Sequence, residues 1–274
     1  MGWVMGHEPL VRSGIFFAVF LVMAVWEIAS PRRRLRTAKG ARWFANLGIM
    51  IVDALVNRAL FPAAAVGMAF LAAERGWGLL NNLDLPPAVA IAASILVLDL
   101  VIYLQHVMFH AVPALWRLHL VHHADVDFDV TTGVRFHPVE IVLSMVVKLA
   151  AVVVLGPPAV AVLIFEVVLN ATAIFNHGNV LLPAAVDRVL RWIVVTPDMH
   201  RVHHSVKPDE TNSNFGFNLP WWDRLLGTYR DQPEAGHGSM TIGLDQFQDR
   251  PHQGLLRLLA LPFIRGGSDR SPGG

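Results

Sequence analysis

The chain of 274 residues is 54% hydrophobic and only 16% charged, and its formal net charge is +1. A soluble domain carries about a quarter charged residues, so this composition excludes an ordinary soluble protein, and the balanced charge argues against a nucleic acid partner. The absence of cysteine excludes structural disulfides, thiolate nucleophiles and cysteine-ligated zinc or iron–sulfur sites. We therefore expect an all-α integral membrane protein.

Two apolar stretches flank a basic segment in the first part of the chain. The run Gly14–Ala29 is near the minimum length of a membrane-spanning helix. A cleaved signal peptide is the alternative, but here the positive charge follows the apolar run instead of preceding it. The second run, Phe44–Ala73, is long enough to cross with tilt. Between them, the arginine-rich segment Arg32–Arg42 predicts a cytoplasmic loop, and residues 1–86 are expected to be anchor helices joined by that loop.

Three polar side chains interrupt the second apolar run. Asp53 and Asn57 are four residues apart, and Arg58 follows directly, so the three can lie close together on a helix surface. Polar groups at membrane depth are costly and often functional. We nevertheless favour an internal ion pair with a structural role at this position.

A third apolar helix is expected from Pro87 to about Gln105, after a loop at 74–87 on the far side of the membrane. It returns the chain to the cytoplasm. Asp99 lies seven residues before His106 and therefore on nearly the same helix face. A carboxylate so placed could orient a metal-ligating imidazole.

The apolar runs Val139–Leu155 and Ala159–Phe175 predict a helical hairpin, because Gly156–Pro158 separates them. The hairpin either crosses the membrane or dips into it and returns. Within it, Glu166 and Asn170 are four residues apart and could pair with each other or support a nearby histidine. The expected bundle thus has about three spanning helices plus this hairpin, with a histidine-rich cap on the cytoplasmic side of the cell's inner membrane.

Ten histidines fall on that expected side of the membrane. Eight lie in three clusters, one H-x-x-x-H and two H-x-x-H-H, whose spacing places imidazoles on shared helix faces. Neutral imidazole is a common metal ligand, and this many ligands suit two metal ions with an exchangeable oxygen ligand. Ligand chemistry alone does not choose iron over copper or zinc. The clustered residues are His106, His110, His119, His122, His123, His200, His203 and His204.

The order of these clusters among membrane helices resembles the fatty acid hydroxylase/sterol desaturase superfamily. Further similarity lies in Thr132–Glu140, Asn176–Asn179 and Asn214–Tyr229. The resemblance covers roughly residues 90 to 230, so we expect a catalytic domain at 87–230. It implies that His177 is a ligand as well, and that His137 is either a ligand or a residue that supports one.

The resemblance also implies a histidine-rich di-iron centre that uses O2 and two electrons to hydroxylate or desaturate a C–H bond of a lipid. The chain carries no haem-ligand motif and no nicotinamide or flavin fingerprint, since the glycines near Gly76 lack the required strand. Electrons are therefore expected from a separate reductase or electron carrier. The residues expected to orient the ligands are Asp99, Glu140, Asp198 and Asn170.

Two other functions fit part of the pattern. A zinc-dependent membrane hydrolase would use the same imidazoles, but it normally has a glutamate directly after its first histidine, as in H-E-x-x-H, and no cluster here has one. A non-enzymatic metal or haem carrier would place its ligands within the spans, whereas these gather at one end.

The remaining parts of the chain show no pattern that predicts a catalytic or metal-binding role. His7, His237 and His252 lack metal-ligand spacing and are expected to be ordinary surface residues. The segment 231–274 is expected to be a partly disordered tail, with one apolar patch, Leu255–Ile264, resting at the membrane interface.

Overall fold

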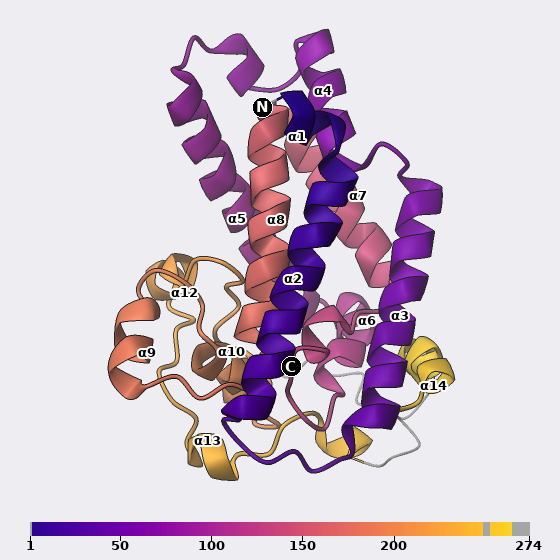
Figure 1. Ribbon diagram of the computed structural model, residues 1–274, viewed down its shortest axis with the longest axis vertical. Coiled ribbons are helices and arrows are strands. Elements are labelled where there is room, and N and C mark those ends of the chain that lie inside the picture. The colour runs from indigo at the N-terminus through magenta and orange to yellow at the C-terminus, as the bar shows by residue number, and fades with distance from the viewer. Residues whose placement is uncertain (1, 249–252, 265–274) are drawn as a thin grey trace.

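The computed structural model describes residues 2–248 and 253–264, and within these ranges it is all-α. No β-sheet forms there, and only the isolated bridges Pro31–Val180 and Ser205–Ile242 occur. Five apolar segments are long enough to cross a membrane. Long helices run side by side through the upper part of the molecule, and short helices gather at the lower end (Figure 1). The predicted all-α membrane bundle is confirmed, including its three spans and hairpin.

The five long apolar helices have the lengths that their apolar runs dictate. They are α2 (Glu8–Ala29), α3 (Lys39–Leu60), α5 (Pro87–Ala111), α7 (Pro138–Leu155) and α8 (Ala159–Asn176). Helix α8 packs against both α2 and α5, while α7 packs against α3. Large apolar side chains such as Leu55 and Val154 stay exposed on their outer faces, as expected where lipid is the solvent.

The second apolar run does not form one helix. It divides into α3 and α4 (Ala64–Arg75), which are separated at Phe61–Ala63. Pro62 lies in this break, and a proline removes a backbone donor and clashes with the preceding turn. Helix α4 then packs against α7 and α8 at the end of the bundle away from the short helices (Figure 1).

The hairpin turns closely over the loop before α5. Helix α7 ends at Gly156, whose φ of +66° is left-handed, and a β-carbon there would lie 2.7 Å from the carbonyl oxygen of Trp77. Gly78 approaches the same backbone from the other side, and a β-carbon on it would come within 2.2 Å of the Gly156 nitrogen. Only glycine suits both positions.

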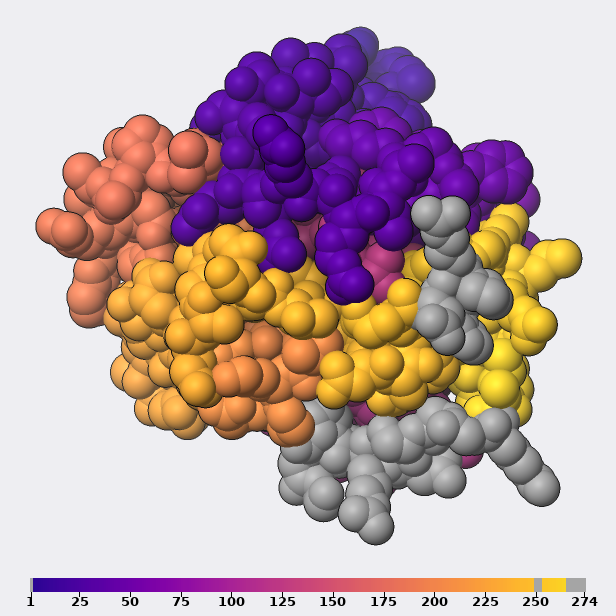
Figure 2. All heavy atoms as spheres, turned by 90° about the horizontal axis from the view of Figure 1, so that it is seen from below, coloured from indigo at the N-terminus to yellow at the C-terminus, as the bar shows by residue number. Residues whose placement is uncertain are grey.

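The short helices form a cap at one end of the bundle. They are α6 (Pro113–His123), α9 (Ala184–Leu190), α10 (Pro197–His203), α11 (Pro208–Thr211), α12 (Trp221–Leu226) and α13 (Gly236–Ser239). The basic segment after α2 lies at this end too, because Arg32 Nε donates to Asp198 at 3.0 Å. Figure 2 shows this end, with the orange and yellow C-terminal segments spread over it. The side of the membrane it faces stays a prediction from the basic segment.

A buried charge network joins α3 to the loop after α6. The Arg42 guanidinium contacts Asp125 at 2.8 Å and Asp129 at 2.5 Å, and none of the three side chains is more than 2% exposed. Asn46 donates to Asp125 at 3.2 Å. Such groups must be paired when buried, so this network fixes the position of the loop relative to the membrane helices.

The C-terminal segment is packed more closely onto the protein than predicted. Helix α14 (Leu255–Ala260) and the turn Leu261–Phe263 lie against α3 and α6, and Leu258 is fully buried. Part of the expected interface patch therefore belongs to a protein core, because Leu258 and Leu261 meet side chains of α3 and α6, whereas Leu256 and Phe263 stay exposed. The predicted disorder of the last residues, 265–274, lies outside the described residues.

Candidate metal centre

The histidine clusters lie where the ends of the long helices meet the cap. His106 and His110 occupy the last turns of α5, and α6 follows after a single residue, Val112, with Pro113 opening its first turn. Proline favours that position because its missing N–H would have no partner in a helix. His177 caps the end of α8, and Pro197 opens the short helix α10, which carries the third cluster.

Nine of the ten predicted histidines come together in two adjoining groups among the described residues. Within each group the candidate ligand nitrogens all lie within 4.8 Å of one another. All nine side chains are at most 3% exposed. The five-histidine group consists of His106, His110, His119, His123 and His203. The four-histidine group consists of His122, His177, His200 and His204.

Each H-x-x-H-H cluster supplies both groups. On α6, His119 and His123 face the five-histidine group, whereas His122 faces the other. In the third cluster the arrangement is reversed, because His200 and His204 join the four-histidine group and His203 the five-histidine group. The first and last residues of each cluster are four apart and therefore share a helix face, while the middle histidine points to a neighbouring face.

Most of the imidazoles are held by a hydrogen bond at Nδ1. His106, His177 and His203 donate from Nδ1 to the carbonyl oxygens of Phe215, Ala173 and Ser213, each at 2.7 Å. His122 donates to the carbonyl of Arg135 at 3.2 Å. Acceptors at Nδ1 select the tautomer whose lone pair is on Nε2. These contacts therefore direct Nε2 into the groups.

The arrangement of lone pairs fits a cation. His122 and His177 both donate from Nδ1 to carbonyl oxygens, so neither Nε2 carries a proton, yet these two nitrogens lie 3.2 Å apart. Two lone pairs cannot hydrogen bond to each other. His106 and His119 repeat the pattern with Nε2 atoms 3.1 Å apart. A metal ion bound between the two nitrogens of each pair would remove this conflict, and an all-imidazole donor set suits iron, copper and zinc.

Protonation of one imidazole in each pair does not supply the missing hydrogen-bond donor, because these side chains are buried. Burial away from water lowers the pKa of His119 to about 3 and that of His177 to about 4. Burial and neighbouring imidazoles also lower the pKa values of five other histidines well below the ordinary value: His122, His123, His200, His203 and His204. At neutral pH the imidazoles are therefore uncharged and able to act as ligands.

His137 lies apart from both groups. Its Nδ1 accepts from the backbone nitrogen of Val139 at 3.2 Å, and its Nε2 donates to the carbonyl of Leu259 at 3.2 Å. Both ring nitrogens are thereby engaged in capping α7 and in holding the C-terminal segment. We do not carry His137 into the proposed ligand set.

Of the four residues expected to orient ligands, only Glu140 contacts an imidazole of either group in the described part of the chain. Its Oε1 accepts from His119 Nδ1 at 2.7 Å. Asp99 instead accepts from Nε1 of Trp222, a residue of α12, at 2.8 Å. Asp198 pairs with Arg32 and Arg201. Asn170 lines the cavity described below.

One histidine expected on the surface is buried. His237 is only 4% exposed, and its Nε2 lies 3.5 Å from Asp198, because α13 packs against α10. Burial lowers the pKa of His237 to about 4, although the nearby Asp198 opposes this effect. His7 is exposed as predicted, and His252 lies outside the described residues.

The oxygen atoms that orient the ligands come largely from segments that sequence reasoning left without a role. They include the carbonyls of Ser213 and Phe215 and the amide of Asn212, whose Oδ1 lies 3.3 Å from His110 Nδ1. Asp223 holds this segment by accepting from the backbone nitrogens of Phe215 and Gly216. The motif Asn214–Tyr229 marks part of this segment in the sequence. A contact made by a backbone carbonyl does not depend on the residue type, however, so the sequence does not reveal it.

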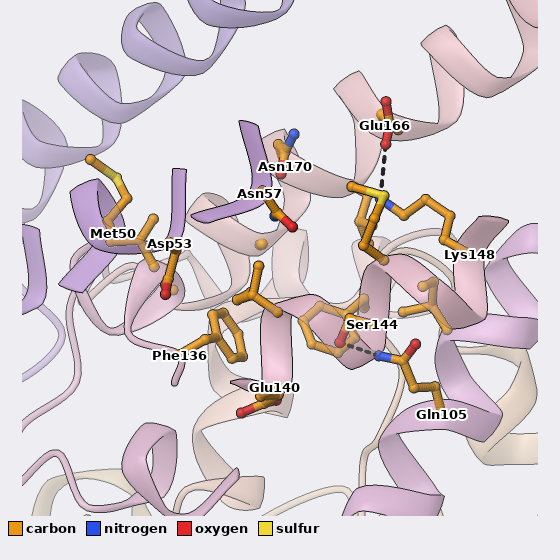
Figure 3. A pocket seen from close by; sticks show the side chains of 18 of the residues that line it. Met50, Asp53, Asn57, Gln105, Phe136, Glu140, Ser144, Lys148, Glu166 and Asn170 are labelled. Atoms are coloured by element: carbon orange, nitrogen blue, oxygen red, sulfur yellow. Dashed lines mark hydrogen bonds and ion pairs between the residues drawn. The ribbon is translucent and has the colours of Figure 1, made fainter. Parts of the chain in front are cut away.

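A cavity of about 360 Å³ opens from the five-histidine group into the membrane helices. His106, His119 and Glu140 line its one end, and its walls include apolar side chains such as Ile102 and Leu169. Figure 3 shows the polar side chains that project into it. The residues that line it come mainly from the long helices α2, α3, α5, α7 and α8.

The predicted ion pair on α3 is wrong. Arg58 is exposed and donates to the carbonyl of Pro62 at 3.1 Å, because it points away from Asp53 around the helix. Asp53 and Asn57 instead line the cavity. The predicted Glu166–Asn170 pair is likewise replaced, since Glu166 contacts Lys148 at 2.9 Å and Arg12 at 3.0 Å.

Comparison with known proteins agrees with this geometry. The sequence profile described as fatty acid hydroxylase matches residues 91–228, about half of the chain. Ornithine lipid hydroxylase OlsE of Rhizobium tropici is 31% identical over 182 residues, which cover 66% of this chain and 53% of the relative. Alkylglycerol monooxygenase of Xenopus tropicalis is 28% identical over 151 residues, 53% of this chain and 32% of the relative. The human alkylglycerol monooxygenase is 26% identical over 161 residues, 57% of this chain and 34% of the relative.

The chain therefore spans about half the length of the first relative and about a third of the others. No solved structure matches it. The profile match spans the first two histidine clusters, His177 and the third cluster together. On this basis the protein belongs to the fatty acid hydroxylase family.

Proposed function

We propose that the protein is a membrane-bound oxygenase that holds two iron ions and uses O2 to hydroxylate or desaturate a lipid. The observation that carries the proposal is the pair of adjoining all-imidazole groups that open onto a cavity between membrane helices. The printed names of the relatives, a lipid hydroxylase and a monooxygenase, support the same reaction class.

The nine grouped histidines are the proposed ligands, one ion in each group. Bound iron would supply the activation of O2 that an unactivated C–H bond requires. The protein's contribution is to present uncharged Nε2 atoms at fixed positions. Carbonyl oxygens hold the Nδ1 protons of His106 and His203, and Glu140 holds that of His119. Fixing the tautomer in this way keeps each ligand oriented before the metal binds.

The cavity would position the substrate and limit access of water. Phe109 and Phe217 lie on its walls beside the histidine end, and ring contacts place Phe217 5.0 Å from the His106 ring. An apolar wall at this point would hold the lipid carbon near the metal group and keep bulk water away.

The proposed reaction needs electrons from another protein. Hydroxylation converts R–H, O2, two electrons and two protons into R–OH and water. Desaturation removes two hydrogens from neighbouring carbons and forms two waters with the same inputs. We propose that a separate reductase or electron carrier supplies the electrons at the cap, which faces the cytoplasm. The proposed catalytic domain is 87–230, with 1–86 as anchor and 231–274 as a C-terminal segment.

The test uses the purified full-length protein with iron, a lipid extract, O2 and a chemical electron donor. The expected result is O2-dependent formation of a lipid that is heavier by one oxygen or lighter by two hydrogens. A His200→Ala variant serves as the inactive control. Protein that retains both irons and accepts electrons, yet consumes no O2 with any lipid fraction, would contradict the proposal.

A further inference from the structure

We infer that the cavity is a binding site for the polar group of an amphipathic lipid, and that this group must donate hydrogen bonds, as a hydroxyl or an ammonium does. The inference rests on the proposed function for the reaction that follows, but not for the binding itself. It assigns Asp53 and Glu140 as the residues that select the substrate.

Two buried carboxyl groups at the histidine end of the cavity have free acceptor atoms. Asp53 is 7% exposed and Glu140 4% exposed, and both line the cavity. Oδ1 of Asp53 and Oε2 of Glu140 have no hydrogen-bond partner among the described residues. Figure 3 shows the two side chains on the same side of the cavity. Buried polar atoms are normally paired.

Two other polar side chains of the cavity also favour a ligand group that donates hydrogen bonds. Asn57 and Gln105 also line it, and each has a buried amide oxygen without a partner in the described part of the chain. Gln105 uses its Nε2 to donate to Ser144 at 2.9 Å, which leaves Oε1 as the free atom. Four side chains that line the cavity on α3, α5 and α7 thus each carry an acceptor atom without a partner, and a donor on the ligand could pair with these atoms.

At the opposite end of the cavity, the acidic and basic side chains are paired with one another. Glu166 is 1% exposed and is contacted by both Lys148 and Arg12. Figure 3 shows Lys148 and Glu166 well separated from Asp53 and Glu140. The cavity therefore has one end with unpaired acceptors, next to His106 and His119, and another end where acid and bases satisfy each other.

This asymmetry fixes the direction in which a lipid would bind. Its donor group would lie between Asp53 and Glu140, and its chain would extend along the apolar wall. Because Glu140 contacts His119 directly, the carbons nearest the metal group would be those of the polar group or next to it. Oxygen would be inserted there, with one atom of O2 going to the carbon and the other, with two electrons and two protons, to water.

Binding is tested without turnover, using metal-loaded protein in detergent in the absence of O2 and reductant. The probes are hexadecanol and hexadecylamine, compared with hexadecyl methyl ether and hexadecyltrimethylammonium, which lack donors. Displacement of a fluorescent lipid gives their affinities. We expect the alcohol and the amine to bind about tenfold more tightly than their methylated partners, because a probe without a donor leaves a buried acceptor without a hydrogen bond.

Substitutions test whether Asp53 causes the preference for probes that donate hydrogen bonds. Asp53→Leu removes the free acceptor, and Asp53→Asn replaces one carboxylate oxygen by a donor, so both should reduce the preference to about twofold or less. Asp84→Asn is the matched control, because Asp84 is exposed in a loop and does not line the cavity, and should keep the preference. Metal content confirms that each variant is folded around its histidines.

Equal binding of donor and methylated probes to the native protein would overturn the inference, and so would a preference that survives in Asp53→Leu. Tight binding of the trimethylammonium probe would show that charge alone is recognised and would also overturn it. If the donor preference is found but no lipid is oxidised with O2 and electrons, the proposed oxygenase fails while the binding site stands.

Discussion

At the scale of single residues, function depends on which nitrogen of each imidazole is free. His119 shows this most directly, because Glu140 accepts its Nδ1 proton while Nε2 lies 3.1 Å from that of His106. Sequence spacing predicted which histidines could share a face. It did not predict their partners, since these come from α7 and from the backbone of the segment near Phe215.

Replacing Glu140 by glutamine should weaken metal binding without unfolding the protein. The amide can still contact His119 but no longer stabilises its Nδ1–H with a charge, and loss of such a partner typically lowers metal affinity about 10- to 100-fold. Competition with a metal chelator measures the change. Asp99→Asn is the control, because Asp99 bonds to Trp222 and to no histidine of either group. Equal metal affinity in wild type and Glu140→Gln would contradict this role.

His137 should prove to be structural. His137→Ala removes the side chain that caps α7 and is expected to lower the free energy of unfolding by about 1 kcal/mol with full retention of metal. Thermal unfolding and metal analysis of the same sample check both parts. Loss of one metal ion on this substitution would restore His137 to the ligand set.

At the scale of elements, the sequence predicted three spanning helices and a helical hairpin because length and hydropathy decide them. Prediction from the sequence failed where contacts between different helices determine the position of a side chain. Asp99 has the heptad spacing to support His106, yet α12 brings Trp222 to it first. Asp53 was paired with Arg58 from local spacing, whereas the cavity between helices accounts for its position. The spacing of residues within one helix does not show which residues of other helices they will contact.

The C-terminal helix α14 should contribute to stability. Leu258 is fully buried against α3 and α6, so Leu258→Ala should reduce the free energy of unfolding by about 3 kcal/mol. Leu256 is 81% exposed on the same helix, and Leu256→Ala should change it by less than about 0.5 kcal/mol. Thermal unfolding in detergent compares the two. Equal effects would mean that α14 is not packed as described.

At the scale of the whole molecule, the bundle separates a lipid-exposed body from a polar cap that holds the histidines (Figure 1). The ion pair of Arg32 with Asp198 ties the segment after α2 to that cap. The sequence predicted that the basic segment and the histidines share one end of the bundle. The side of the membrane depends on how the chain inserts, and this is testable because the chain has no cysteine.

Single cysteines should report the orientation in intact cells. Asp84→Cys, in the exposed loop before α5, should react with a membrane-impermeant thiol reagent added outside. Arg34→Cys, exposed in the basic segment at the cap end, should react only after the membrane is permeabilised. The reverse pattern would place the cap outside the cytoplasm.

The most direct test of the central claim is the metal content of the purified full-length protein after loading with iron. We predict two irons per chain in the wild type, one in a His204→Ala variant that loses a ligand of the four-histidine group, and one in a His110→Ala variant that loses a ligand of the five-histidine group. A wild type that binds a single iron, or variants that keep both, would contradict the assignment of the two groups as separate metal sites.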